Sequence, residues 1–186
     1  MSTTVGHAIC GIASYFSKRK LAGTNTGFSV WTLLLFIFLA NLPDLDMLVS
    51  YMLTGNPLQY HGQVSHSLIF ICITGFIVMY VVESKRTLLL WLLYTLPLAS
   101  HLLLDSLTGP DIGFHDSRGI ALLWPFEVDR ISFPVTIMNG PRHDTWERLF
   151  SLYNIKVVLL EIVILTPVAF FTWLMLWRKN AENKPD

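Results

Sequence analysis

A run of almost uninterrupted apolar residues from Ile155 to Trp177 is the feature that most restricts the fold of this chain. A helix needs roughly 20 such residues to cross a bilayer of about 30 Å, and this run supplies them. Shorter apolar runs cover residues 28–42, 66–82 and 87–104. With 53% hydrophobic and 14% charged residues, the chain is too apolar for an ordinary soluble domain and is typical of a membrane protein.

We therefore expect an all-α fold, a multi-pass transmembrane helical bundle of four long apolar helices and a short N-terminal helix. The short helix is predicted at Val5–Phe16, where small residues allow close helix packing. Residues 1–179 are expected to form a single membrane-embedded domain, and residues 180–186 a disordered tail. Residues 47–65 are interpreted as a mixed connection between helices.

Charge and cysteine content exclude several classes of function. The formal net charge is zero, so nothing in the overall charge favours binding to nucleic acid, and no nucleic-acid partner is expected. Cys10 and Cys72 lie in apolar surroundings without a CxxC pattern, which predicts packing residues and no disulfide framework. The N-terminus lacks the pattern of a cleaved signal peptide, so Met1 is expected to be retained.

The distribution of basic residues predicts the orientation of the bundle. Chaining the predicted spans puts eight cations on one side of the membrane: Lys18, Arg19, Lys20, Lys85, Arg86, Arg178, Lys179 and Lys184. Five cations lie on the other side, mostly in the long segment 106–154, which counts less in the positive-inside rule. The eight-cation side, with the C-terminus, is therefore expected to be cytoplasmic.

A histidine and an aspartate close the apolar run that ends at residue 105. His101 and Asp105 lie four residues apart, so on a helix they project from one face. A neutral imidazole and an ionised carboxylate can both bind a divalent cation. Alternatively the two side chains bond to each other as a polar clasp between helices, and the pair alone does not decide between these interpretations.

Other candidate ligands fall on the same predicted side of the membrane. Asp44 and Asp46 stand at the edge of a span, where carboxylates need a partner. His143 and Glu147 repeat the four-residue spacing, although an exposed amphipathic turn has the same pattern. The full predicted set of metal ligands is His7, Asp44, Asp46, His61, His66, His101, Asp105, His115, His143 and Glu147.

Imidazole and carboxylate donors without thiolates favour zinc, and manganese, iron or nickel also suit these ligand types. The candidates suffice for two or three ions, and clustered ions support displacement at phosphorus. His61 and His66 are about 140° apart on an ideal helix, so at least one is expected in the preceding turn. Glu161, inside the longest apolar run, is interpreted as a structural partner of Arg142, Arg148 or Lys156.

Several short motifs, taken together, resemble the YdjM-like family of inner-membrane proteins. They are Gly6-His7, Leu42-Pro43-Asp44-Leu45-Asp46, His61-Gly62-Gln63-Val64-Ser65-His66-Ser67, Ser100-His101-Leu102-Leu103-Leu104-Asp105 and Leu123-Trp124-Pro125-Phe126. The resemblance covers the chain up to about Phe150 and implies a membrane-bound metal-dependent hydrolase of the inner membrane. Gly62-Gln63 departs from the Arg-Gly that follows the first His in that family, which would alter a contact to phosphate.

A fainter resemblance is to the all-helical zinc-dependent phospholipase C and single-strand nuclease superfamily. It implies that Asp105 bridges two ions and that the catalytic residues Asp46 or Asp44 lie near the attacking water. We therefore expect a metal-dependent phosphoesterase with its site at the extracytoplasmic face, acting on a phospholipid or another membrane-associated phosphoester. A non-catalytic regulator or assembly factor with a structural metal cluster is the alternative, and a metal carrier is a third candidate. The oligomeric state is left open.

Overall fold

The computed structural model describes residues 1–22, 28–114, 116–117, 119–142 and 146–182. The described residues are mostly helical. In chain order the elements are α1 (Thr4–Leu21), α2 (Val30–Asn41), η1 (Leu42–Leu45), α3 (Asp46–Thr54), η2 (Val64–His66), α4 (Leu68–Val82), α5 (Leu88–Ser106), β1 (Thr108–Gly109), β2 (Met138–Asn139), α6 (Trp146–Leu149) and α7 (Leu152–Glu182).

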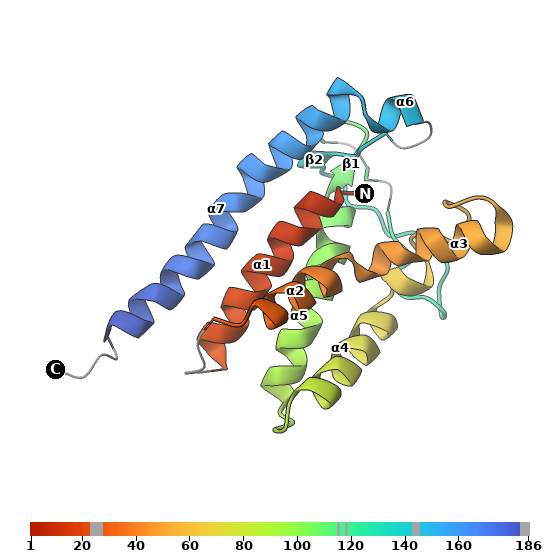
Figure 1. Ribbon diagram of the computed structural model, residues 1–186. Helices are drawn as coiled ribbons and strands as arrows, with labels where there is room; N and C mark the ends of the chain where they lie inside the picture. Colours follow the sequence, from red (N-terminus) through yellow and green to blue (C-terminus); the bar gives the residue numbers. More distant parts are fainter. Residues whose placement is uncertain (23–27, 115, 118, 143–145, 183–186) are drawn as a thin grey trace.

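Helix α1 is the centre of the bundle, since it packs against α7, α2 and α5 (Figure 1). Its approach to α2 depends on Gly11, because a Cβ there would lie 2.7 Å from the carbonyl oxygen of Phe36. Helix α4 packs on α5 at Gly75, whose missing side chain leaves room for Thr95. Small residues thus let the helix backbones meet, as in membrane bundles generally.

Within the described part of the chain, three helical segments are long and apolar enough to cross a membrane: Val30–Thr54, Leu88–Ser106 and Glu147–Met175. Helix α4 is apolar but shorter, so the expected fourth long span is a helix of 15 residues. The N-terminal helix α1, in contrast, is longer than the predicted Val5–Phe16. It has 18 residues and continues through Lys18, because the Lys18 ammonium finds Glu83 Oε1 at 2.7 Å and need not end the helix in water.

The structure corrects three further expectations. Residues 47–54 of the expected connection belong to α3 (Asp46–Thr54), which ends before Gly55; this glycine has a φ of +73°, a left-handed conformation that favours glycine. Helix α7 runs on to Glu182, beyond the predicted boundary at residue 179. The fold also contains a two-residue parallel pair, β1 with β2, so it is mostly rather than purely helical.

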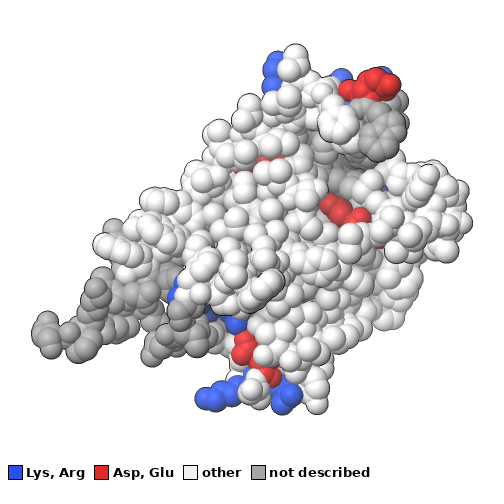
Figure 2. Space-filling model, viewed as in Figure 1, with Lys and Arg blue, Asp and Glu red and all other residues white. Residues whose placement is uncertain are grey.

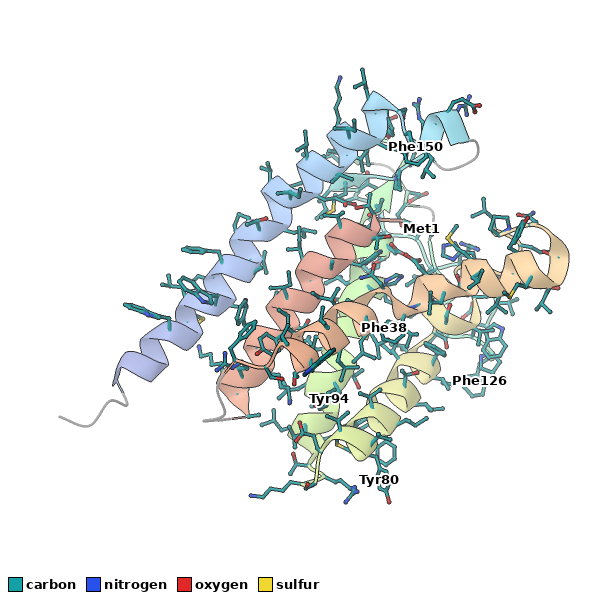
Figure 3. All side chains as sticks on the ribbon, viewed as in Figure 1. Met1, Phe38, Tyr80, Tyr94, Phe126 and Phe150 are labelled. Atoms are coloured by element: carbon teal, nitrogen blue, oxygen red, sulfur yellow. The ribbon has the colours of Figure 1, made fainter. Side chains whose placement is uncertain are left out.

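A hydrophobic core fills the space between α1, α2, α4 and α5. Tyr15, Phe36 and Tyr94 are its large aromatic members, and Leu98 packs with them without exposure. Tyr94 lies low in the bundle in Figure 3, whereas Met1 lies at the opposite end of α1. Polar side chains from several helices lie at that upper end, directly above the apolar core.

Candidate metal centre

Four side chains from three elements converge at the end of the bundle that holds the N-terminus of α1. Asp44 comes from η1, His66 from η2, and His101 with Asp105 from one face of α5. One ligand atom from each lies within 4.8 Å of those of the other three. Nε2 of His101 is 3.1 Å from Nε2 of His66, 3.4 Å from Asp105 Oδ2 and 3.5 Å from Asp44 Oδ1.

Two more histidines border this group of four. The His7 ring stacks on the His101 ring with centroids 3.8 Å apart, and its Nε2 lies 3.4 Å from Asp105 Oδ1 and 3.8 Å from Asp44 Oδ2. His61 Nε2 lies 3.9 Å from Asp44 Oδ1. Hence residues separated by almost a hundred positions in sequence present donors to one small volume.

Hydrogen bonds on the far side of each ring fix which nitrogen faces the centre. His101 Nδ1 lies 2.8 Å from the carbonyl oxygen of Ala40, which can only accept, so Nδ1 carries the proton. His61 Nδ1 lies 2.5 Å from Asp46 Oδ1. His66 Nδ1 lies 2.9 Å from the hydroxyl oxygen of Ser65, which itself donates to Asp46, and 3.3 Å from Asp46 Oδ2. In the neutral form, His66 and His101 therefore present an Nε2 lone pair to the centre, whereas His61 Nε2 also lies 2.5 Å from Met1 Sδ.

Asp46 lies behind the histidines. Besides facing both Nδ1 atoms, its Oδ2 accepts hydrogen bonds from the Gly62 N–H at 3.1 Å and the Ser65 hydroxyl at 2.6 Å. Asp46, His61 and His66 also form a second group whose ligand atoms are close enough to share an ion. In the arrangement observed, however, the carboxylate orients the two rings, as the outer partners of metal-bound histidines do.

The centre contains more hydrogen-bond acceptors than hydrogen-bond donors. Among the described residues, His7 Nδ1 and Nε2, Asp44 Oδ1 and Asp105 Oδ2 are buried without a hydrogen-bond partner. A buried polar group without a partner costs about 1–3 kcal/mol, and two facing Nε2 lone pairs repel each other. A divalent cation would satisfy the two carboxylate oxygens and the single lone pair of His7, whose other ring nitrogen carries a proton, so the residues fit a metal. A His–Asp clasp would instead require protonated rings, because Nδ1 of His101 already donates to Ala40.

Local backbone conformation places these ligands. Pro43 lies in the first turn of η1, where the chain turns between α2 and α3 and brings Asp44 to the centre. Gly62 adopts φ of +77° directly after His61. Arg130 from the long 106–145 segment donates to the His61 carbonyl oxygen at 2.6 Å, and its guanidinium fills the space where a Cβ of Gly62 would be.

The N-terminus of α1 is tied to the centre by contacts that the sequence did not indicate. The Ser2 N–H donates to Asp105 Oδ1 at 2.8 Å. The hydroxyls of Ser2 and Thr3 and the N–H of Thr3 all donate to the carboxylate of Glu161. Glu161 is fully buried, and its hydrogen-bond partners among the described residues are at this helix end. The sequence had instead indicated Arg142, Arg148 or Lys156 as partners. Isolated serines and threonines carry no sequence signal for such a role.

Three predicted ligands lie outside the cluster or outside the described residues. Glu147 is exposed on α6 and belongs to neither group of donors found in the described part of the chain. His115 and His143 lie outside the described residues. The structure thus brings together seven predicted ligands: His7, Asp44, Asp46, His61, His66, His101 and Asp105.

Access to the centre is restricted to its carboxylate edge. The side chains of His7, His66, His101 and Asp105 have no exposed surface, whereas Asp44 is 22% exposed and Asp46 is 14% exposed. Figure 2 shows acidic atoms at the surface in a hollow beside α3. A molecule from outside therefore reaches the centre over Asp44.

Comparison with known proteins agrees with a membrane location. Residues 1–181 match the family model described as YdjM inner membrane protein. The chain is 28% identical over 153 residues to the inner membrane protein YbcI of Escherichia coli (strain K12), which covers 77% of this chain and 82% of that protein. No solved structure matches the chain.

Proposed function

The chain belongs to the YdjM inner membrane protein family, and we propose that it is a membrane-bound metal-dependent hydrolase that cleaves a phosphoester of a membrane lipid. The observation that carries this proposal is the group of imidazole and carboxylate side chains around Asp44 and Asp105, in which Asp44 Oδ1 and Asp105 Oδ2 are buried without a hydrogen-bond donor from the described residues. Such a donor set suits zinc, and manganese, iron or nickel share the preference for imidazole and carboxylate.

Some residues of the centre would bind the cation, and others orient the side chains that bind it. His66, His101 and Asp105, fully buried, would hold a cation, and His7 and His61 lie close enough to complete the coordination of one or two ions. Asp46 keeps the rings of His61 and His66 in the required tautomer. When bound, the cation would polarise a phosphoryl oxygen and make a nearby water more acidic. Asp44, at the exposed edge, faces the incoming ester.

The depth of the centre supports a lipid substrate. Helix α5 begins at Leu88, next to the basic pair Lys85 and Arg86, and reaches Asp105 after about 26 Å of helix. The hydrocarbon core of a bilayer is about 30 Å thick. A basic end at the cytoplasmic interface would therefore leave the centre close to the phosphates of the opposite leaflet. Figure 2 shows basic side chains at the lower end of the molecule, away from the acidic hollow.

Burial of the ligands favours a second candidate function. Structural metal sites are closed, whereas catalytic sites keep a position for water or substrate. Four cluster side chains have no exposed surface, which suits a structural cluster in a membrane regulator or assembly factor. The partial exposure of Asp44 favours the catalytic reading, because it leaves one side of the centre reachable.

Release of phosphate or head group tests the proposal. Purified protein loaded with zinc, and separately with manganese, is supplied with a panel of bacterial phospholipids in mixed micelles. We expect metal-dependent release that disappears in Asp105→Ala and persists in Asp129→Ala, which removes an exposed carboxylate elsewhere in the chain. Stoichiometric metal without release from any lipid or soluble phosphoester would favour the structural cluster.

A further inference from the structure

A cavity of about 330 Å³ opens against the exposed edge of the metal centre. It lies between the N-terminal turn of α1, the start of α3 and the start of α7. Its lining includes Asp44, Val5, Met47, Leu149 and Val158. In Figure 3, Met1 and Phe150 mark the region in which α1 and α7 begin.

The cavity is lined mostly by apolar surface, with polar side chains from Asp44, Asn154, Ser2, Thr3 and Thr4. The hydroxyls of Ser2 and Thr3 already donate to Glu161. Asp44 Oδ1 is buried and, among the residues that the structure describes here, receives no hydrogen bond. Asn154, the other polar side chain of the wall at α7, is fully engaged: its Oδ1 accepts from the Arg142 N–H, and its Nδ2 donates to carbonyl oxygens, among them that of Leu149. The side chains of Met47 from α3 and Val158 from α7 are apolar.

The surroundings of the cavity are also apolar and belong to membrane spans. Met47 lies in the span Val30–Thr54, and Val158 in the span Glu147–Met175. Phe150 and Leu152, at the start of α7, are 78% and 77% exposed. Large exposed apolar side chains on a spanning helix face lipid, so the cavity has walls that an acyl chain can enter laterally.

We infer that this cavity is the binding site for the acyl chain of a phosphate-bearing lipid, whose phosphate would lie beside a cation held by Asp44 and its neighbouring ligands, since phosphate and the bare carboxylate would repel each other. The placement of the phosphate depends on the proposed function, whereas the apolar walls do not. Cavities of about 300 Å³ or more are typical of ligand sites with apolar walls and few polar groups. This cavity takes the first part of a chain, and the remainder stays in the bilayer.

A larger cavity on the other side of the centre is a weaker candidate. It measures about 420 Å³, and Asp46, Leu42, Val49 and Phe70 are part of its lining. Its carboxylate already accepts hydrogen bonds from Gly62 and Ser65 and faces two histidines. A phosphate in that cavity would meet an oriented and satisfied Asp46, whereas at Asp44 it meets the open edge of the centre.

Photo-crosslinking tests the inference independently of hydrolysis. The probe is a lysophosphatidate with a diazirine near the carboxyl end of its acyl chain, added to the protein in phosphatidylcholine nanodiscs. We expect adducts on the 147–158 segment and around Met47. Excess oleoyl lysophosphatidate should abolish them, and glycerol 3-phosphate, which has the same head group without the chain, should not. Each two methylenes buried strengthen binding about tenfold, so the two competitors should differ by at least about 100-fold.

Paired tryptophan variants locate the site. Val158→Trp fills the cavity and should remove the adducts, while Leu159→Trp, the adjacent and 56% exposed position, should keep them. Both variants should retain wild-type metal content. Adducts spread over all lipid-facing helices, or insensitive to Val158→Trp, would overturn the acyl-chain site. Localised adducts without phosphate release would support the acyl-chain site and refute the proposed hydrolase activity. Phosphate release from glycerol 3-phosphate without localised adducts would support hydrolase activity and refute the acyl-chain site.

Discussion

The backbone N–H of Ser2 donates a hydrogen bond of 2.8 Å to Asp105 Oδ1, so the first residues of the chain touch the carboxylate at the middle of the metal centre. The hydroxyl of the same serine donates to Glu161 at 2.6 Å. Glu161 sits at the N-terminal end of α1, where the helix dipole favours a negative charge. It therefore holds the helix that carries His7, and it does so from within a membrane span.

Replacing Glu161 should weaken metal binding without removing a ligand. Glu161→Ala deletes the acceptor for three hydrogen bonds from Ser2 and Thr3, which should lower stability by about 1–3 kcal/mol. We expect about a tenfold loss of metal affinity, comparable to the loss of other outer partners. Glu161→Gln keeps an acceptor and should restore most of it. Zinc titration with a competing chelator measures this, with Glu127→Ala as the exposed control; equal affinity in all variants would refute a positioning role.

Replacing Asp46 and replacing Asp105 should affect metal binding to different degrees. Asp46→Asn removes the charge that orients His61 and His66 but leaves their Nε2 atoms, so metal affinity should fall about 10- to 100-fold. Asp105→Asn removes a direct ligand and should abolish stoichiometric binding. The measurement is metal retained after dialysis against graded chelator, with Asp129→Asn as control. A complete loss in Asp46→Asn would mean that Asp46 itself binds the ion.

The ion pair at the opposite end of the bundle predicts a pH dependence of stability. Burial raises the pKa of Glu83, but the hydrogen bonds from Lys18 and Tyr94 outweigh it and hold the pKa below its usual value. The stabilisation is therefore present above the unfolded pKa of about 4.3 and disappears as the pH falls through the lower folded pKa. At neutral pH, Glu83→Gln should be less stable by about 1 kcal/mol.

Thermal unfolding in detergent at neutral pH and below about pH 4 checks this dependence, because the difference between wild type and Glu83→Gln should shrink in acid. Lys18→Met and the double variant complete the cycle. Additive effects of the two substitutions at neutral pH would show that the 2.7 Å contact between Lys18 and Glu83 contributes no coupling.

Membrane orientation is predicted from the basic residues and can be measured by cysteine labelling. With Cys10 and Cys72 replaced by alanine, Ser84→Cys should react with an impermeant maleimide only after the cells are permeabilised. Asp129→Cys, in the long segment beside the centre, should react in intact spheroplasts. The reverse pattern would place the metal centre on the cytoplasmic side, and the substrate would then come from the inner leaflet.

Local periodicity predicted part of this site, and the rest depends on tertiary contacts. The spacing of His101 and Asp105 was sufficient to place both on one helix face, because the helical repeat alone fixes it. The irregular stretch between His61 and His66 was also anticipated from their spacing, and His66 lies in η2. In contrast, the position of Asp46 behind two rings follows from the turn at Pro43, which no periodic pattern describes.

Glu161 shows why partners are harder to predict than spans. Its isolation in an apolar run indicated a special role, but the nearest cations in sequence suggested ion pairs with Arg142, Arg148 or Lys156. The actual partners, Ser2 and Thr3, lie almost 160 residues away and are brought close because α1 packs along α7. Helix α3 was missed for a related reason: its mixed residues have no strong repeat, and Gly55 ends it after nine residues.

X-ray absorption spectroscopy of the zinc-loaded protein tests the metal centre most directly. The account predicts nitrogen and oxygen ligands at about 2.0–2.1 Å with scattering from more than one imidazole, weakened in His66→Ala and in His101→Ala but unchanged in Asp129→Ala. Zinc that is absent after purification and loading, or a spectrum that neither histidine variant alters, would contradict the claim that these side chains converge on a cation.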